Sequence, residues 1–469
     1  MRRRTLLLPA VLLVLAAGFA TPDPASAQNS VAVEDTVPAQ DLAPSHDLLL
    51  ASTPAPRPIT LAEAVDLARR NSLVRVEARG RSRTAAAQVR SAYGAFVPTL
   101  SITGGGTRQL PAGSDRTRIE NGQVIVLPAT PWSYNTTIGS SLQLFDGGRR
   151  LFELHQAHAE QDAAETNENA QQFEAVLEAK QEYFNVLAWR EAEAAAAVQL
   201  EQAEQQLKTA VLRVRAGSAT RSDSLRSVIQ VSTARLAMSE ARNNVVVANA
   251  SLTRAVGSPE PVTAASEDST SLVGLSVGEA ELVRLVEQSP SVKQAKADLD
   301  VAQAGQKVAR TGYIPTVNAA YNYSGSGTER PFAFGSDDFD YNGSLRLSFS
   351  IPIFDQLARE ESVVRADVAK DNAEATLKDA TLAARQSLAQ RLADYRNAEE
   401  RVFTQTATLS TADEDYRVQE RRYQVGASTL LDLLASQTLV NQARQDLIRA
   451  RYDQRVAKAQ LEALVGKSL

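Results

Sequence analysis

The chain has 469 residues, of which 22% are charged, and its formal net charge is −5 at pH 7. This balance excludes a protein that depends on a strongly basic surface, such as a nucleic-acid-binding protein. The sequence has no cysteine, which excludes disulfides, thiolate metal sites, a cysteine nucleophile and lipid attachment at an N-terminal cysteine. Only 5% of the residues are aromatic, and the long polar stretches are rich in alanine, which favours extended helices packed on small side chains.

The first residues have the order of a secretory signal. Three arginines at positions 2–4 precede an apolar run that extends to about Ala20, and Ala25-Ser26-Ala27 follows as a small-residue cleavage site. We therefore expect a signal peptide over 1–27 and a flexible, proline-rich leader over 28–58, which buries too little apolar surface to fold. No later apolar run has the length of a membrane-spanning helix, so any membrane crossing by the mature chain must use strands.

The two halves of the remaining sequence repeat one pattern. Arg213, Gly217 and Asp223 recur as Arg422, Gly426 and Asp432, each 209 residues later (422 − 213, 426 − 217, 432 − 223). The same offset relates Phe145-Asp146 to Phe354-Asp355, Arg235 to Arg444, and Val256-Gly257 to Val465-Gly466. A collinear series of matches indicates a tandem duplication. We place the first repeat at 59–257, a linker at 258–274 and the second repeat at 275–466.

Each repeat begins with two predicted helices. A short helix starts near Thr60, where Glu63 stands at the spacing of a capping box, and its counterpart starts near Ser276. Longer helices follow over about 73–93 and 292–310, and each ends before a glycine with a proline beyond it.

A pair of strands comes next in each repeat, within 98–145 and 315–353. Apolar residues alternate with small hydroxylated ones, most regularly where Leu345, Leu347 and Phe349 oppose Ser344, Arg346 and Ser348. Each run has about the 9 to 11 residues that a tilted strand needs to cross a bilayer. A soluble sheet with one solvent-exposed face gives the same alternation. The pattern alone therefore fits both membrane-spanning strands and a soluble sheet. Polar loops join the strands over about 108–131 and 325–340.

Long helical hairpins complete the repeats, over 149–256 and 357–465. Mostly apolar residues recur at alternating steps of four and three, as in Phe173, Leu177, Phe184 and Leu187 with Lys180 among them, and no proline interrupts the runs. Gly217 and Gly426 mark the turns. A single helix up to residue 216 would be about 100 Å long at about 1.5 Å per residue, which indicates a coiled coil or the wall of a helical tube.

Four strands cannot close a membrane barrel, because about eight is the practical minimum and open edges are not viable in lipid. The subunit is therefore expected to associate with copies of itself. Two copies would give eight strands and three would give twelve, and physics does not choose between them.

This order of elements, written twice behind a signal peptide, resembles the TolC family of outer-membrane efflux proteins over about residues 59–466. The most specific matches are Thr60-Leu61-Ala62-Glu63-Ala64-Val65, the two Phe-Asp strand exits, and Tyr423-Gln424-Val425-Gly426 followed by Asp432. The resemblance implies a mainly α subunit with a small antiparallel β part. It also implies a homotrimer in the outer membrane, with a twelve-helix α-barrel crossing the periplasm and joined to a twelve-stranded transmembrane β-barrel. Its partners would be a periplasmic adaptor, an inner-membrane pump and outer-membrane lipid.

The resemblance also assigns residues at the hairpin tips. Asp432 matches a position that lines the channel constriction, and Tyr423 and Asp223 match a pair whose interhelical hydrogen bond helps to hold the channel closed. The tips that would meet the adaptor carry Arg213, Gly217, Thr220, Arg422, Gly426 and Thr429. Relatives can have an arginine where Ser428 stands and a second aspartate where Ala435 stands, so fewer contacts are expected to hold this gate. The alternative for both aspartates is that of an acidic residue at a helix N-terminus, stabilised there by the helix dipole.

Other classes of function have less support in the sequence. There is no serine elbow, Walker lysine or paired histidine and carboxylate constellation, so we expect neither an enzyme nor a cofactor. His155 and His158 share a helix face but make an incomplete metal site, and Trp189 is expected to pack within its helix bundle. The expected function is a passive export channel for drugs, metals or other toxic solutes. A conduit for type I protein secretion and a non-conducting coiled-coil tether are the alternatives.

Overall fold

The computed structural model of the protein describes residues 55–110, 116–127, 132–265, 274–275, 277–328 and 340–469. These residues belong to one structural unit that begins at Pro54. The expected signal peptide, the leader up to residue 54 and parts of both strand-connecting loops lie outside the described residues. Within the described residues, no helix combines the length and the apolarity that crossing a bilayer requires.

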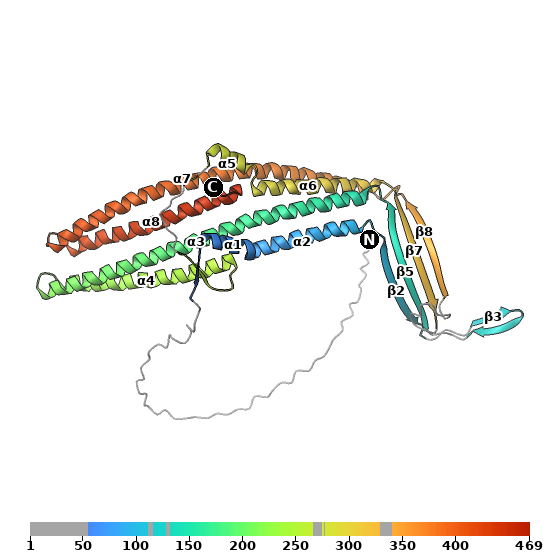
Figure 1. Ribbon diagram of the computed structural model, residues 1–469, viewed down its shortest axis with the longest axis horizontal. Coiled ribbons are helices and arrows are strands. Elements are labelled where there is room, and N and C mark those ends of the chain that lie inside the picture. Colours follow the sequence, from blue (N-terminus) through green and yellow to red (C-terminus); the bar gives the residue numbers. More distant parts are fainter. Residues whose placement is uncertain (1–54, 111–115, 128–131, 266–273, 276, 329–339) are drawn as a thin grey trace, which may run out of the picture. The chain divides into compact units, whose positions relative to one another are not determined.

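Four long helices form the two hairpins. Helix α3 (Arg149–Arg215) is followed by α4 (Arg221–Val256), and α7 (Ala358–Gln424) by α8 (Leu430–Val465). α3 and α7 have 67 residues each, α4 and α8 have 36 each, and both pairs are offset by the same 209 residues as the sequence repeat. α3 packs against α4 and α7 against α8, and α3 joins the two hairpins through α8 (Figure 1).

Shorter helices extend this layer. α1 (Leu61–Asn71) and α2 (Leu73–Gly94) belong to the first repeat, and α5 (Glu279–Val286) and α6 (Pro290–Arg310) to the second, where a 3₁₀ turn (η2, Thr311–Tyr313) follows. α2 packs on α3, and α6 packs between α3 and α7 (Figure 1). The Thr60 side chain accepts a hydrogen bond from the Glu63 amide at 3.2 Å and so caps α1 as the sequence predicts.

A four-stranded antiparallel sheet joins the repeats in the order β2-β5-β7-β8. Its strands are β2 (Thr99–Arg108), β5 (Trp132–Phe145), β7 (Thr316–Gly327) and β8 (Asp340–Ser350). The central pair β5–β7 comes from different repeats, with Ile138 opposite Tyr323. Both predicted strand pairs therefore form, and β2 and β8 remain as the edges of the sheet.

Three small features differ from the sequence prediction. The loop predicted over 108–131 contains a hairpin of β3 (Arg116–Glu120) and β4 (Gln123–Leu127), whose turn residues Asn121 and Gly122 have φ of 55° and 76°. Left-handed angles at an Asn-Gly pair identify a two-residue hairpin turn, a signal that was present in the sequence. In addition, β1 (Arg57–Ile59) pairs in parallel with β6 (Val262–Ala264). The predicted leader, which ended at residue 58, therefore overlaps β1. The predicted linker over 258–274 contains β6.

The buried apolar residues gather in two main clusters. The first surrounds Tyr183 of α3 and includes Ile59, Leu252 and Val262, so β1, β6 and α1 cover the middle of the first hairpin. The second surrounds Leu461 of α8 and includes Leu282, Val286 and Tyr395, so α5 covers the second hairpin. Many buried positions between the long helices are alanines, which permits close approach of the helix axes.

Candidate functional site at the hairpin tips

Each hairpin tip turns on one glycine in the left-handed conformation. Gly217 has φ of 73° and Gly426 has φ of 78°. At the first tip the Ser218 amide donates to the Arg213 carbonyl at 2.9 Å, and at the second the Ala427 amide donates to the Arg422 carbonyl at 2.8 Å. These bonds define a Schellman ending, which needs a residue without a Cβ penalty. The predicted turns at Gly217 and Gly426 are confirmed.

The helix that leaves each tip starts with a complete capping box. The Asp223 carboxylate accepts hydrogen bonds from the Thr220 amide (3.0 Å) and hydroxyl (2.8 Å), while the Thr220 hydroxyl accepts from the Asp223 amide at 3.3 Å. Thr429 and Asp432 repeat this arrangement at 3.1, 2.7 and 3.2 Å. Both aspartates therefore lie in the first turn of a helix, as the alternative from the sequence expected, and the structure adds that they complete the cap.

These hydrogen bonds also set the charge of the tips. Backbone and side-chain hydrogen bonds from Thr220 lower the pKa of Asp223. Side-chain and backbone hydrogen bonds from Thr429, with a further bond from the Ser428 hydroxyl at 3.2 Å, lower the pKa of Asp432. Both carboxylates are therefore negatively charged at neutral pH, and Asp432 is exposed to solvent.

Arg213 links the two tips to each other. Its guanidinium lies 4.4 Å from the Tyr423 ring centroid. Nη1 and Nη2 donate to the carbonyl oxygens of Tyr423 at 3.0 Å and Gln424 at 2.8 Å. These are among the last carbonyls of α7, which have no partner inside their own helix. Arg213 of α3 therefore caps the end of α7.

This link replaces the one that the sequence led us to expect. Among the described residues, no hydrogen bond joins the Tyr423 hydroxyl to Asp223, because the carboxylate is engaged by Thr220 and the Tyr423 ring packs beside Leu430, Leu433 and Leu434. Ser428, at the position where relatives can have arginine, donates to Gln419 at 3.2 Å as well as to Asp432. Sequence reasoning missed the role of Arg213 because its partners are main-chain carbonyls, which leave no signal in the sequence.

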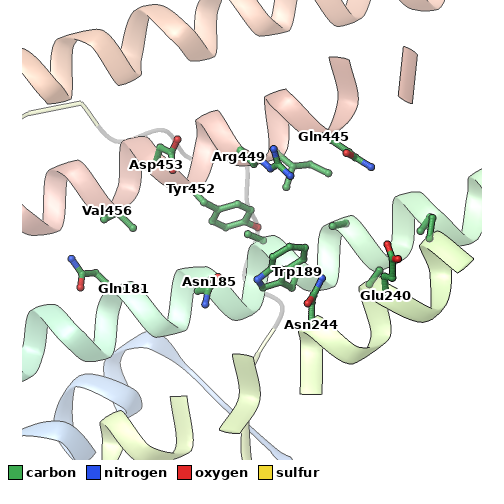
Figure 2. Close-up of a pocket in the computed structure, with 16 residues that line it drawn as sticks. Gln181, Asn185, Trp189, Glu240, Asn244, Gln445, Arg449, Tyr452, Asp453 and Val456 are labelled. Carbon is green, nitrogen blue, oxygen red and sulfur yellow. The ribbon is translucent and has the colours of Figure 1, made fainter. Parts of the chain in front are cut away.

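A hollow of about 410 Å³ lies farther along the helices, between α3, α4 and α8 (Figure 2). Trp189 and Tyr452 project into it, with Asn185, Asn244 and Arg449 around them. Tyr452 is buried, and burial, together with the nearby Glu191 carboxylate, raises its pKa to about 12. Trp189 also packs against the cluster around Tyr183, so the prediction that it packs within the bundle is confirmed.

The junctions between sheet and helices are built alike in both repeats. Asp146 accepts bonds from the Arg150 amide (3.1 Å) and Nε (2.7 Å), and Asp355 accepts from the same atoms of Arg359 at 3.3 and 2.8 Å. The guanidinium of Arg150 stacks on Phe96, and that of Arg359 stacks on Tyr313. The two Phe-Asp exits therefore fix where each strand becomes a long helix.

The histidines near the first junction are engaged in packing. His155 Nδ1 lies 2.7 Å from the Leu151 carbonyl oxygen, and the His158 ring meets Tyr93 edge-on. In the described part of the chain, no group of three histidine or carboxylate side chains is arranged to hold a metal ion.

The Outer membrane efflux protein family matches residues 65–258 and 282–467, which is most of the chain. The chain belongs to this family. The recognition of a TolC-type outer-membrane channel protein from the sequence is therefore confirmed.

Similar proteins carry several functional names. Protein CyaE of Bordetella pertussis is 27% identical over 93% of this chain and 90% of its own length. Outer membrane protein TolC of Escherichia coli is 25% identical over 62% of this chain and 61% of its own length. Among solved structures, CusC has a TM-score of 0.73 at 19% identity, covering 87% of this chain and 92% of its own. The open-state MtrE channel of Neisseria gonorrhoeae has a TM-score of 0.70 at 21% identity, covering 87% and 89%. These structures show that the fold is shared.

Proposed function

We propose that three copies of this chain form a passive export channel in the outer membrane. The four strands of each copy would contribute to a twelve-stranded transmembrane barrel, and the hairpins to a twelve-helix tube that extends into the periplasm. The channel conducts small toxic solutes while its hairpin tips dock on a periplasmic adaptor coupled to an inner-membrane pump. The protein itself performs no chemistry.

The observation that carries this proposal is the open four-stranded sheet. The strand order β2-β5-β7-β8 places the edges β2 and β8 in opposite directions, so β8 of one copy can pair antiparallel with β2 of the next. Apolar side chains are exposed on both edges: Leu100 (74%) and Ile102 (67%) on β2, and Leu345 (71%) and Phe349 (67%) on β8. Exposed apolar faces and unpaired edges are satisfied together when a ring of copies closes within lipid.

The similarity to solved channels supports the same assembly, because the shared fold includes both the strands and the hairpins. The relatives' names support export but differ in cargo. OpmQ of Pseudomonas aeruginosa is a pyoverdine export protein, and TtgC of Pseudomonas putida belongs to a toluene efflux pump. We therefore assign transport to the assembled tube and leave the cargo to the pump that supplies it.

Conductance and particle mass test the proposal. The mature chain, purified in detergent, is expected to have the mass of a trimer and to give discrete current steps in a planar bilayer. A non-conducting tether would give no current at any voltage. A water-soluble monomer that needs no detergent would contradict both the barrel and the channel.

A further inference from the structure

The two repeats make the same ion pair inside each hairpin. Arg235 of α4 pairs with Glu204 of α3 at 3.1 Å. Arg444 of α8 pairs with Asp413 of α7 at 3.7 Å, and both residues lie 209 positions later. The offset therefore relates positions that have the same surroundings within a hairpin. Contacts that one repeat makes can therefore be compared with those at the equivalent positions of the other repeat.

Inside the chain, the contacts between the hairpins run from α3 of the first repeat to α7 and α8 of the second. Glu191 of α3 pairs with Arg451 of α8 at 3.7 Å, and Arg213 of α3 caps α7 at the tip. The positions 209 later on α7 are Glu400 and Arg422, which are residues of the same types. Both are exposed, and among the described residues neither side chain makes a hydrogen bond or an ion pair, although the charge of Arg422 acts on Asp432.

The first repeat also contains the equivalents of the receiving positions, with partners inside their own hairpin. Arg451 corresponds to Arg242 of α4, which is exposed and pairs with Glu193 of its own hairpin at 3.4 Å. The carbonyls of Tyr423 and Gln424 correspond to those of Val214 and Arg215, at the end of α3. Thus the chain contains a second set of contact residues. Its members on α7 and its members on the first hairpin do not meet within the chain.

The exposed fractions of equivalent residues on α8 and α4 also differ between the two repeats. Leu434 of α8 is 9% exposed, whereas its equivalent on α4, Leu225, is 57% exposed. Gln437 is 7% exposed, whereas Val228 is 46% exposed. The face of α8 that is buried within the chain is therefore uncovered on α4, although the α4 residues are at least as apolar. Burial of such a face against a helix is the expected source of its stability.

We infer that the second repeat of one copy makes with the first repeat of the next copy two of the contacts that the first repeat makes with the second inside the chain; the Lys180–Glu462 pair is not among them, because its equivalents are Ala389 and Thr253. Glu400 of α7 pairs with Arg242 of the neighbouring copy, and Arg422 caps the end of α3 in that copy through the carbonyls of Val214 and Arg215. This inference rests on the proposed self-assembly. It assigns the residues that join the copies along the helical tube.

The two trans contacts differ in one respect from the cis contacts. The ring on which Arg213 stacks belongs to Tyr423, and its equivalent is Val214, which has no ring. Arg422 therefore keeps the two main-chain acceptors but loses the cation–π contribution. The tip contact between copies is consequently weaker than the tip contact within a copy, and the tips separate first at the boundary between copies.

Cross-linking tests the ion pair, and the absence of cysteine from the sequence makes the test direct. The full chain carrying Glu400→Cys and Arg242→Cys is treated, as the detergent-purified oligomer, with a short bis-maleimide. We expect most of the monomer band on a denaturing gel to shift to covalent dimer and trimer. The matched control, Glu191→Cys with Arg451→Cys, is expected to be linked within one chain and to keep the mobility of a monomer.

Two results would overturn the inference, and they differ in what they say of the channel. A chain that assembles and conducts but whose 400/242 pair remains monomeric after treatment contradicts the assigned contact and leaves the proposed function intact. A chain that is monomeric in detergent and gives no current contradicts both. Particle mass and bilayer current, measured on the same preparation, separate the two results.

The tip contact has its own test. Lysine offers a single charged nitrogen, so Arg422→Lys cannot cap two carbonyls as a guanidinium does. We expect this variant to lower the temperature at which the oligomer dissociates in detergent. Arg421→Lys changes the exposed neighbour in the same way and is expected to leave that temperature unchanged. Equal dissociation temperatures for the two variants would contradict the cap.

Discussion

At the scale of single residues, the two tip aspartates combine a structural and an electrostatic role. Each carboxylate holds the first turn of its helix through threonine and remains charged because those hydrogen bonds favour the ionised form. Asp432 is exposed as well as fixed, so its charge is available to solutes. A fixed, exposed carboxylate repeated by symmetry in a narrow pore attracts cations.

Replacement of Asp432 tests this electrostatic role. Asp432→Ala removes the charge and the cap, whereas Asp432→Asn removes the charge and keeps a side-chain oxygen that can cap. If the charge selects cations, both variants shift the reversal potential in a salt gradient toward zero, and by similar amounts. Unchanged reversal potentials would contradict a role for Asp432 in selectivity, and a shift in the alanine variant alone would assign the effect to the cap.

Acidification provides a second residue-scale prediction. The pKa values of Asp223 and Asp432 in the folded protein lie below the ordinary value, so their ionised forms stabilise the folded tips. That stability is fully present above the ordinary carboxyl pKa of about 3.9 and is lost as the pH falls through the lower folded values. Hydrogen exchange is expected to show fraying of the first turns of α4 and α8 in this acidic range. The double variant Asp223→Asn/Asp432→Asn should show no such pH dependence.

At the scale of elements, Arg213 joins the tips of the two hairpins. It supplies two hydrogen bonds from a charged group and a stacking contact to the end of α7. We expect Arg213→Ala to destabilise the last turn of α7 by about 2 kcal/mol, because the Gln424 carbonyl loses the guanidinium and the Tyr423 carbonyl is left with the Gly426 amide at 3.1 Å. Faster hydrogen exchange in that turn would report the loss.

A neighbouring arginine provides the control for this element. Arg215 lies two residues farther along α3 and is exposed, with its charge also near the helix end. Arg215→Ala removes the same charge from the tip but none of the bonds to α7. Equal exchange rates in the two variants would show that charge at the tip, rather than the cap, holds α7.

At the scale of the whole molecule, the alternation in β8 predicts which face of the strand would meet lipid in the proposed barrel. Leu347 and Ser348 are adjacent and lie on opposite faces of the strand. Leu347→Arg is expected to destabilise the assembled barrel by about 2–4 kcal/mol, because it places a charge in the bilayer core. Ser348→Arg adds the same charge to the face that already carries Arg346 and is expected to be tolerated. The yield of heat-resistant oligomer in membranes measures both effects, and equal yields would favour a soluble sheet.

The sequence by itself determined the features that depend on local chemistry. Repeated glycines, threonines and aspartates at fixed spacing predicted both hairpin turns, and alternation predicted the four strands of the sheet, because turns, caps and one-sided strands each need particular residue types within a few positions. The Asn-Gly turn of the β3–β4 hairpin was equally local and was overlooked inside a polar loop.

Only the tertiary structure decided which parts of the chain meet. The pairing of β1 with β6 brings together segments about 200 residues apart, and the cap of Arg213 on α7 uses main-chain carbonyls that every residue possesses. The hollow between α3, α4 and α8 arises from three helices of two repeats. Such contacts depend on how distant elements pack, and the duplicated sequence, which is alike in both halves, does not state which helix faces meet inside the chain.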